Sequence, residues 1–404
     1  MSRLTGVLPK LAFVLSLLFA AAGSVQARGF LPPVKYPVGM HPVDAAVADF
    51  NGDGKPDVAV ANNTGNSISI LFGNGDGTFV TGRTYPCRDP QALVAADLNR
   101  DGKVDLVAAC QVRPGVGLLV FLNSSSGFLS PQGYGAYGLP SCLAVGDFDG
   151  DAIPDIVAAV GDAVSFVKGN GDGSFQPPQS FMAGVSIDGL AAADLNKDGK
   201  LDLVAADQLE GADVLLGNGD GTFAAPAYIF DGSQPLSVAL GDLNRDGNLD
   251  LVLADLKDTV TLCLGNGDGT FQAPVTYTVG KEPRSVSLGD FNGDGVLDVA
   301  VVLARAGSIT VMFGRGDGTF PLLTQFPAGG PDAICWRGVA ADLNHDRVLD
   351  LVVVDENTAS ISILMNSGST DGWPSLSRSV RRLGMLSRHI SSRQSPGFAA
   401  FSVL

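Results

Sequence analysis

The chain alternates short apolar segments with polar turns over most of its length. The apolar segments are rich in valine and alanine, such as Val-Ala-Leu-Gly at 238–241 and Asp-Val-Ala-Val-Ala at 57–61. No long run with a helical period lies near them. Short apolar runs of this kind, bounded by Gly, Asn and Asp, indicate buried β-strands joined by tight turns. The pattern therefore predicts an all-β fold.

One polar turn recurs at a nearly constant interval. It reads Asp-x-(Asn/Asp)-x-Asp-x-x-x-Asp and separates two apolar segments each time. Its seven copies follow one another at steps of 47 to 52 residues and begin at Asp49, Asp97, Asp147, Asp194, Asp242, Asp290 and Asp342. A fixed period in this range means that each repeat is one supersecondary unit that buries its apolar face against the next.

A second polar turn completes the repeat. It reads Gly-Asn-Gly-Asp-Gly-Thr-Phe at 73–79, recurs with small changes at 169–175, 217–223, 265–271 and 314–320, and is eroded at 123–128. Because it carries one acid, we interpret it as a tight hairpin followed by a packing phenylalanine rather than as a second metal loop. A fourth strand follows, as at 274–277. Seven units of four antiparallel strands predict a seven-bladed β-propeller.

The two ends of the repeat region complement each other. The segment 30–39 matches 271–280, so it is a fourth strand with no blade before it. The seventh repeat supplies three strands up to Met365 and then loses the pattern. We therefore expect the N-terminal strand to complete blade seven, which removes a free sheet edge. The predicted propeller spans residues 28–366.

The nine-residue turn carries the ligands of a calcium ion. Oxygens from the side chains at positions 1, 3, 5 and 9 and from the main chain at position 7 suit a hard cation that prefers six to eight oxygens. An EF-hand would need a glutamate at position 12, where all seven copies have an apolar residue. Asp, Asn and Gly also form turns without a metal, but such turns do not require an acid at positions 1, 5 and 9 of every copy.

We therefore predict several calcium ions, up to seven. The predicted ligands, in chain order, are Asp49, Asn51, Asp53, Lys55, Asp57, Asp97, Asn99, Asp101, Lys103, Asp105, Asp147, Asp149, Asp151, Ile153, Asp155, Asp194, Asn196, Asp198, Lys200, Asp202, Asp242, Asn244, Asp246, Asn248, Asp250, Asp290, Asn292, Asp294, Val296, Asp298, Asp342, Asn344, Asp346, Val348 and Asp350.

Position 6 distinguishes the copies. Five carry glycine there, whereas the third has Ala152 and the seventh has Arg347. If the turn needs a left-handed residue at this point, a side chain costs roughly 1–2 kcal/mol. We expect the third and seventh loops to bind calcium more weakly, although Asp149 gives the third loop a fourth carboxylate.

The Asp-x-Asn-x-Asp-Gly-x-x-Asp loops and the Phe-Gly-Asn-Gly-Asp-Gly-Thr-Phe turn resemble the FG-GAP/VCBS repeat family, the blade type of the integrin α head. The resemblance covers residues 30–366. It implies a seven-bladed propeller with calcium in hairpins on one face and ligand recognition usually on the other. Ala152 and Arg347 depart from the family pattern. No stalk domain or membrane segment follows the repeats, so the resemblance does not make the chain a receptor.

The formal charge of −16 arises largely in the predicted metal loops, which hold 22 of the 42 acidic residues, three in each loop and Asp149 in addition. Acidity is thus a metal signature, and without a basic stripe nucleic-acid binding is not expected. Five cysteines are too few and too irregular for a disulfide framework, and an odd number leaves at least one unpaired or linked to another chain. Cys87 and Cys142 occupy equivalent connections and could pair.

Both ends of the chain depart from the repeat. Residues 1–27 have Arg3 and Lys10, an apolar run at 11–22 and a small-residue cleavage site, which together indicate a secretory signal peptide rather than a membrane anchor. The segment 367–404 is rich in Ser and Arg and lacks alternation. We interpret it as a disordered basic tail; a shifted reading frame is the alternative. The mature protein is expected to be secreted or at the cell surface, without a membrane span.

No catalytic constellation is recognisable, so we expect a binding or adhesion module for an extracellular protein or carbohydrate rather than an enzyme. Ligand residues are expected in the connections opposite the metal loops. The aromatic and polar candidates are Trp336 and Arg337, in the long connection 326–337, and Tyr134 and Tyr137. Rim packing would explain them equally well. The alternative functions are a polysaccharide lyase or hydrolase, and a structural component of a surface or matrix.

Overall fold

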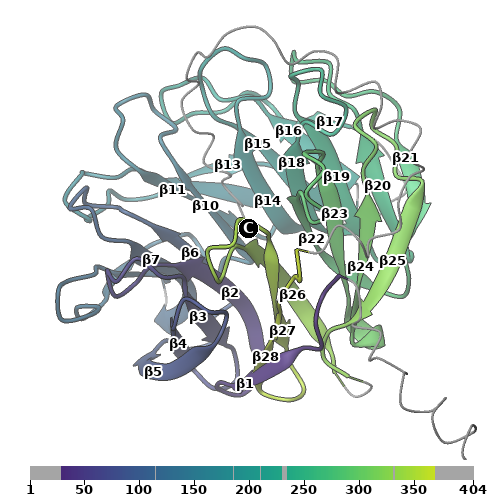
Figure 1. Cartoon of the computed structure of the whole chain (residues 1–404). Coiled ribbons are helices and arrows are strands. Elements are labelled where there is room, and N and C mark those ends of the chain that lie inside the picture. The colour runs from purple at the N-terminus through teal and green to yellow at the C-terminus, as the bar shows by residue number, and fades with distance from the viewer. Residues whose placement is uncertain are drawn as a thin grey trace, which may run out of the picture.

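The computed structural model describes residues 29–368, apart from 114, 185, 210, 230–233 and 331–332. Over this range the chain forms seven four-stranded antiparallel sheets arranged as the blades of a ring (Figure 1). The predicted seven-bladed β-propeller is confirmed. The predicted signal peptide and almost all of the predicted tail lie outside the described residues.

Each blade begins with the strand nearest the ring axis and continues outward. Blade one contains β2 (Pro42–Ala48), β3 (Asp57–Asn62), β4 (Ser67–Gly73) and β5 (Phe79–Pro86), and blade two contains β6 (Ala92–Ala96), β7 (Asp105–Arg113), β8 (Val116–Phe121) and β9 (Gln132–Tyr134). Blade three contains β10 (Cys142–Gly146), β11 (Asp155–Val160), β12 (Ala163–Val167) and β13 (Gln179–Met182), and blade four contains β14 (Ile187–Ala193), β15 (Asp202–Asp207), β16 (Gly211–Leu215) and β17 (Ala227–Tyr228). Blade five contains β18 (Pro235–Gly241), β19 (Asp250–Asp255), β20 (Thr259–Cys263) and β21 (Val275–Thr278). Blade six contains β22 (Pro283–Gly289), β23 (Asp298–Leu303), β24 (Ser308–Phe313) and β25 (Leu322–Pro327). Blade seven contains β26 (Cys335–Ala341), β27 (Asp350–Asp355), β28 (Ser360–Leu364) and β1 (Val34–Pro37). A 3-10 turn, η1 (Ala304–Ala306), precedes β24.

The N-terminal strand closes the ring. β1 pairs antiparallel with β28, with Val34 opposite Ile363, and Phe30 forms a bridge with Asn366. The innermost strands contact one another in sequence, and β26 contacts β2, so the first and last blades are neighbours. This arrangement confirms that the segment 30–39 is the missing fourth strand of blade seven.

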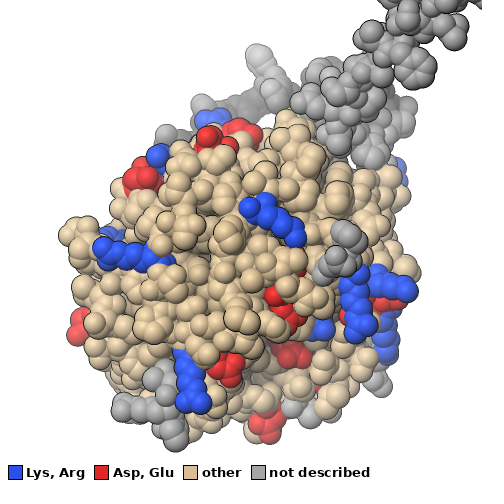
Figure 2. Space-filling model, turned by 90° about the horizontal axis from the view of Figure 1, so that it is seen from below, with Lys and Arg blue, Asp and Glu red and all other residues tan. Residues whose placement is uncertain are grey.

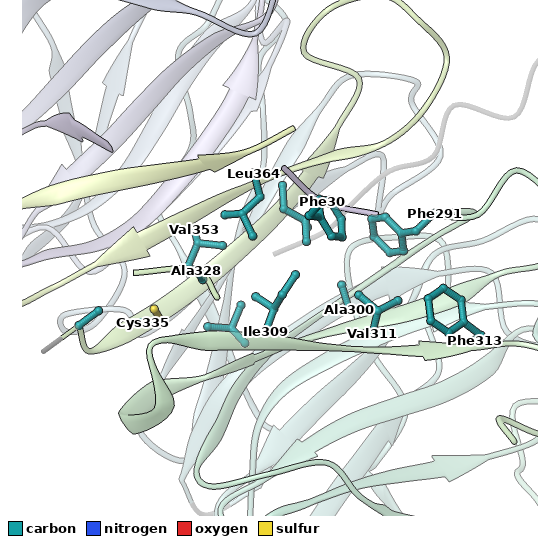
Figure 3. Packing of buried hydrophobic residues seen from close by; sticks show 13 residues of the cluster. Phe30, Phe291, Ala300, Ile309, Val311, Phe313, Ala328, Cys335, Val353 and Leu364 are labelled. Carbon is teal, nitrogen blue, oxygen red and sulfur yellow. The ribbon is translucent and has the colours of Figure 1, made fainter. Parts of the chain in front are cut away.

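The hydrophobic core lies between the blades. In five blades the second strand is buried at every residue, because each sheet packs against a neighbour on both faces. This explains why these strands are continuous apolar runs rather than alternating ones. Figure 3 shows the cluster between blades six and seven, where Phe291 and Val311 meet Val353 and Leu364, with Phe30 between them.

Aromatic pairs join neighbouring blades near their outer strands at six interfaces of the ring. The outermost strand supplies one ring, and the phenylalanine of the next blade's glycine-rich turn supplies the other, with centroids 5.3–5.9 Å apart. The pairs are Tyr36–Phe79, Tyr85–Phe128, Tyr134–Phe175, Phe181–Phe223, Tyr277–Phe320 and Phe326–Phe30. The phenylalanine after the turn therefore packs as predicted, and Phe30 takes this role for blade seven.

The structure shows a cysteine pair other than the one considered from the sequence. Cys87 forms a disulfide with Cys110, and their Cα atoms are 6.0 Å apart. Cys142 is free and buried, so the Cys87–Cys142 pairing is wrong. Cys110 lies within β7, which packs against the blade that Cys87 follows, and both side chains belong to one core cluster. Sequence spacing alone does not show which strand faces a connection.

Candidate metal centres

The seven nine-residue loops join the first and second strands of the seven blades. Each therefore lies at the same end of its innermost strand, and the loops form a circle on one face of the ring. In every blade the position 1 acid directly follows the innermost strand, as Asp49 follows β2, and the position 9 acid begins the second strand, as Asp57 begins β3. All seven predicted loops are thus placed equivalently.

The first loop shows how the oxygens are held. Asp49 accepts backbone hydrogen bonds from Gly52 at 2.7 Å and Asp53 at 3.1 Å through Oδ1, and from Gly54 at 2.7 Å through Oδ2. Asn51 Oδ1 accepts from the Asp53 N–H at 2.8 Å, and Asp53 Oδ1 from the Lys55 N–H at 3.0 Å. The backbone therefore coils around its own side-chain oxygens and fixes positions 1, 3 and 5.

The position 9 aspartate ties the loop to the rest of its blade. Asp57 is fully buried, and it accepts the Phe50 N–H at 3.0 Å and the Gly73 N–H at 2.8 Å. Phe50 belongs to the loop, whereas Gly73 starts the glycine-rich turn. The corresponding acid makes the same two kinds of bond in every blade: Asp105, Asp155, Asp202, Asp250, Asp298 and Asp350. No pattern in the sequence indicates this bridge between the two turns.

Burial raises the pKa of all seven position 9 carboxyls, and the negative charges at positions 1 and 5 of most loops raise it further. The pKa reaches about 6 for Asp57 and about 7 for Asp298 and Asp350, although two backbone N–H groups oppose the shift. Each loop thus holds a buried carboxylate beside other acids, and a cation would offset that repulsion.

The backbone is left-handed at position 6 in all seven loops. The five glycines have φ between 80° and 83°, and Ala152 and Arg347 have φ of 61° and 70°. The geometric premise for ranking the third and seventh loops lower is therefore correct, while their affinities stay a prediction.

Position 4 is left-handed too, which the sequence reading missed. Three loops have glycine there, and the other four have Arg100, Lys197, Arg245 and His345 with φ of 59° to 63°. Two of these long side chains reach the next loop: Lys197 donates to Asn248 Oδ1 at 2.7 Å, and Arg245 donates to the Gly295 carbonyl. The first and sixth loops have glycine at both positions, and the seventh has it at neither.

The donor set fits a calcium ion. The side-chain oxygens at positions 1, 3 and 5, the carbonyl of position 7 and the buried carboxylate of position 9 are the hard ligands that calcium prefers. The ion would supply the positive charge that these acids lack. It would hold the loop closed between the first two strands of the blade, and it has no chemical step to perform.

The third loop is unusual in its charges. Asp147, Asp149 and Asp151 each bring an oxygen within 4.8 Å of the others, the one such group of three acids among the residues that the structure describes. The Lys168 ammonium donates to Asp149 and, at 2.8 Å, to Asp151. These hydrogen bonds raise the pKa of Lys168 above its ordinary value. A cationic group therefore already lies among these carboxylates.

The glycine-rich turns hold their aspartates differently. Asp76 Oδ1 accepts from both the Thr78 N–H at 2.9 Å and the Thr78 hydroxyl at 2.5 Å. The same motif recurs at Asp172, Asp220, Asp268 and Asp317. These bonds lower the pKa of each of the five carboxyls. In three of the turns the first glycine and the closing phenylalanine form an antiparallel bridge, Gly169 with Phe175, Gly217 with Phe223 and Gly265 with Phe271, which agrees with the interpretation as hairpins.

The four predicted ligand residues do not form one site. Tyr134 packs against Phe175 between blades two and three, and Tyr137, 65% exposed, donates its hydroxyl to the Pro178 carbonyl at 2.9 Å. Trp336 and Arg337 lie together elsewhere, and their expected placement in a connection is wrong because both belong to β26. Arg337 Nε pairs with the buried Asp44 at 3.2 Å, which joins blades seven and one.

Trp336 has a partner that the sequence reading missed. The Arg284 guanidinium lies 3.9 Å from the centre of the Trp336 ring, and Arg284 Nε is buried without a hydrogen-bond partner among the described residues. Burial lowers the pKa of Arg284, and the charges of Glu282, Glu356 and Asp188 oppose that shift.

These residues occupy equivalent places in the repeat. Five innermost strands change register near the end opposite the metal loops, and the extra residues include Asp188, Arg284 and Trp336. Each of the three lies six residues before the first acid of its loop, so aligning the repeats could have grouped them. Bulges of this kind often aim side chains at a binding site.

The chain belongs to the FG-GAP-like repeat family. The family's model matches residues 35–108, 147–205, 194–253, 242–301 and 300–353, most of the chain. The unmatched stretch between 108 and 147 contains the eroded turn of blade two. Among curated proteins, none matches the sequence.

Solved structures share the fold at low sequence identity. A lectin of Agrocybe aegerita that specifically recognises non-reducing terminal N-acetylglucosamine is 20% identical, with a TM-score of 0.51 over 74% of this chain and 90% of the lectin chain. A chain of the BBS1N–ARL6DN complex soaked with mercury is 12% identical, with a TM-score of 0.60 over 85% of this chain and 99% of that chain. At these sequence identities, both similarities show a shared fold alone.

Two observations bear on possible partners. Within the described ranges, no helix is long and apolar enough to cross a membrane. On the side of the ring seen in Figure 2, basic and acidic side chains are scattered over a largely uncharged surface. The absence of a nucleic-acid partner stays a prediction.

Proposed function

We propose that this protein is an exported, calcium-stabilised propeller that acts as a binding module rather than an enzyme. The observation that carries the calcium assignment is the buried position 9 carboxylate, which lies beside other acids in all seven loops. A propeller without a cation in most of these loops would keep buried, mutually repelling charges. Calcium is plentiful outside cells, so the expected export of the protein is consistent with calcium binding.

The ligand surface that we propose lies at the end of the ring opposite the loops. Trp336 offers an aromatic face, Arg284 on the adjacent blade six offers a cationic group against that ring, and Asp188 on blade four offers a carboxyl group whose pKa the Arg284 charge acts to lower. A flat aromatic ring beside hydrogen-bonding groups suits a sugar or a peptide. Carbohydrate is our first choice, because a propeller of this fold recognises N-acetylglucosamine in the Agrocybe aegerita lectin. An extracellular protein ligand is the second.

One observation favours the enzyme alternative, a polysaccharide lyase or hydrolase. Burial raises the pKa of Asp188, as an acid catalyst would require, while nearby Arg284 acts to lower it. The charge of Asp207 also raises the pKa of Asp188. Asp207, however, is fully buried and accepts backbone hydrogen bonds from Ser186 and Leu209, so the two acids do not form an exposed general acid–base pair. A structural role in a surface or matrix would need neither group.

A glycan array probed with calcium-loaded protein tests the ligand proposal. We expect carbohydrate binding that Trp336→Ala abolishes and that Tyr137→Ala, an exposed control on the rim, leaves unchanged. Turnover of an extracellular polysaccharide that Asp188→Asn abolishes would replace the proposal with the enzyme alternative. If neither glycans nor extracellular proteins bind and no polysaccharide is turned over, the structural role remains.

A further inference from the structure

Blade three breaks the repeat at one position next to its metal loop. The residue before the glycine-rich turn is apolar in six blades: Phe72, Leu122, Leu216, Leu264, Phe313 and Met365. In blade three it is Lys168. In four of the six blades this apolar side chain lies against a glycine in the turn of the next blade, as Leu122 lies against Gly173. At the matching glycine of blade four, Gly221, the neighbour is Phe166 instead.

Lys168 instead turns toward the metal loop of its own blade. Its ammonium bridges Asp149 and Asp151, at positions 3 and 5, and Asp149 is only 6% exposed. Lysines at position 7 of three other loops pair only with the position 5 acid of the same loop, at 3.0–3.6 Å, and are 41–43% exposed. A cation that reaches two ligand positions from outside the loop is thus particular to blade three among the described loops.

A second departure coincides with the first. Position 3 is asparagine in six loops and a carboxylate, Asp149, only in the third. The extra negative charge of Asp149 forms an ion pair with the extra positive charge of Lys168, so the two changes compensate each other. A third change, Ala152 at a left-handed position 6, weakens the same loop as a calcium site.

We infer that the Lys168 ammonium takes the place of the calcium ion in the third loop, so that this blade is held closed without metal. The inference rests on the proposed calcium binding by the other loops. Two hydrogen-bonded ion pairs supply part of the charge that a divalent ion would supply. Calcium and the ammonium compete for the same oxygens of Asp149 and Asp151, and like charges exclude each other there.

Native mass spectrometry in calcium tests this inference. We expect Asp151→Asn to leave the number of bound ions unchanged, whereas Asp198→Asn, the same position in the fourth loop, lowers it by one. Lys168→Met, which introduces the residue of blade seven, should raise the number by one. Leu216→Met, the matched change in blade four, should leave it unchanged.

The outcomes separate the two proposals. If the wild-type chain binds calcium and Asp151→Asn removes one ion, the third loop is an ordinary site and the inference about Lys168 is wrong. An unchanged ion number in a folded Lys168→Met variant would overturn it as well. If the wild-type chain binds no calcium, the proposed function itself fails, and the inference fails with it.

Discussion

The nine-residue loops and the glycine-rich turns are both rich in Asp and Gly, yet they treat their acids in opposite ways. In blade four, burial raises the pKa of Asp202 in the loop, and the acids of the same loop raise it further. In the adjacent turn, hydrogen bonds from Thr222 lower the pKa of the exposed Asp220. The two aspartates belong to one blade, and Asp202 also accepts the N–H of Gly217 at the start of that turn.

This difference teaches what a metal loop needs beyond composition. The turn satisfies its one carboxylate with its own threonine, so it gains nothing from a cation. The loop gathers three or four carboxylates, one of them buried, and the backbone N–H groups alone do not offset their repulsion. The number of acids and the burial of one of them decide whether the segment needs a cation, whereas glycine decides only the shape of the backbone.

Removing calcium should produce the largest effect, because it acts on several loops and on no turn. Each ion that binds only the native state adds about 2.7 kcal/mol at a hundredfold excess over its Kd. We expect a chelator to lower the Tm by more than about ten degrees. A thermal unfolding curve that does not change with chelation would contradict the calcium assignment for every loop.

Substituting one acid in a loop and one in the neighbouring turn should separate the two regions within a single blade. Asp198→Ala removes a predicted ligand from the fourth loop, and we expect the loss of one bound ion and of measurable stability. Asp220→Ala, the control in the adjacent turn, should keep every ion. Native mass spectrometry gives the count, and an equal loss in the two variants would show that the regions do not differ as proposed.

The seventh loop should be less sensitive than the fourth. It has His345 and Arg347 at its two left-handed positions, so Asp346→Ala should remove less calcium and less stability than Asp198→Ala. Arg347→Gly should relieve strain and stabilise the protein by about 1 kcal/mol. Gly54→Ala, the reverse change in the first loop, should destabilise it. Chemical denaturation measures both, and a stability gain from Gly54→Ala would show that position 6 needs no glycine.

The smallest expected effect concerns pH and the turns. The folded-state pKa of Asp220 lies below its ordinary value of 3.8, so its stabilising contribution is complete above that pH and is lost as the pH falls through the folded-state pKa. We expect Asp220→Asn to be less stable than the wild-type chain at pH 7, with a difference in unfolding free energy that shrinks as the pH falls below 3.8. The acids of the metal loops titrate in both the variant and the wild-type chain, so their effect cancels in the difference between the two unfolding free energies at each pH. A gap that widens in acid would contradict the assigned hydrogen bonding.

The repeat made the fold predictable, because period, strand pattern and the match of 30–39 with 271–280 each follow from local sequence. The placement of the nine-residue loops between the first and second strands was predictable for the same reason. Contacts between segments were not. Cys110 faces Cys87 because β7 packs against blade one, and Trp336 lies in a strand because β26 begins at Cys335. Lys168 reaches Asp149 from the segment that follows β12, which no spacing within a nine-residue motif reveals.

The number of calcium ions that the wild-type chain binds tests the central claim most directly. Native mass spectrometry in excess calcium should find at least three and at most six ions, since seven loops are present and Lys168 fills the third. Exchange into a chelator should remove them all. A chain that stays free of calcium in excess of the ion would contradict the assignment of these loops as metal centres.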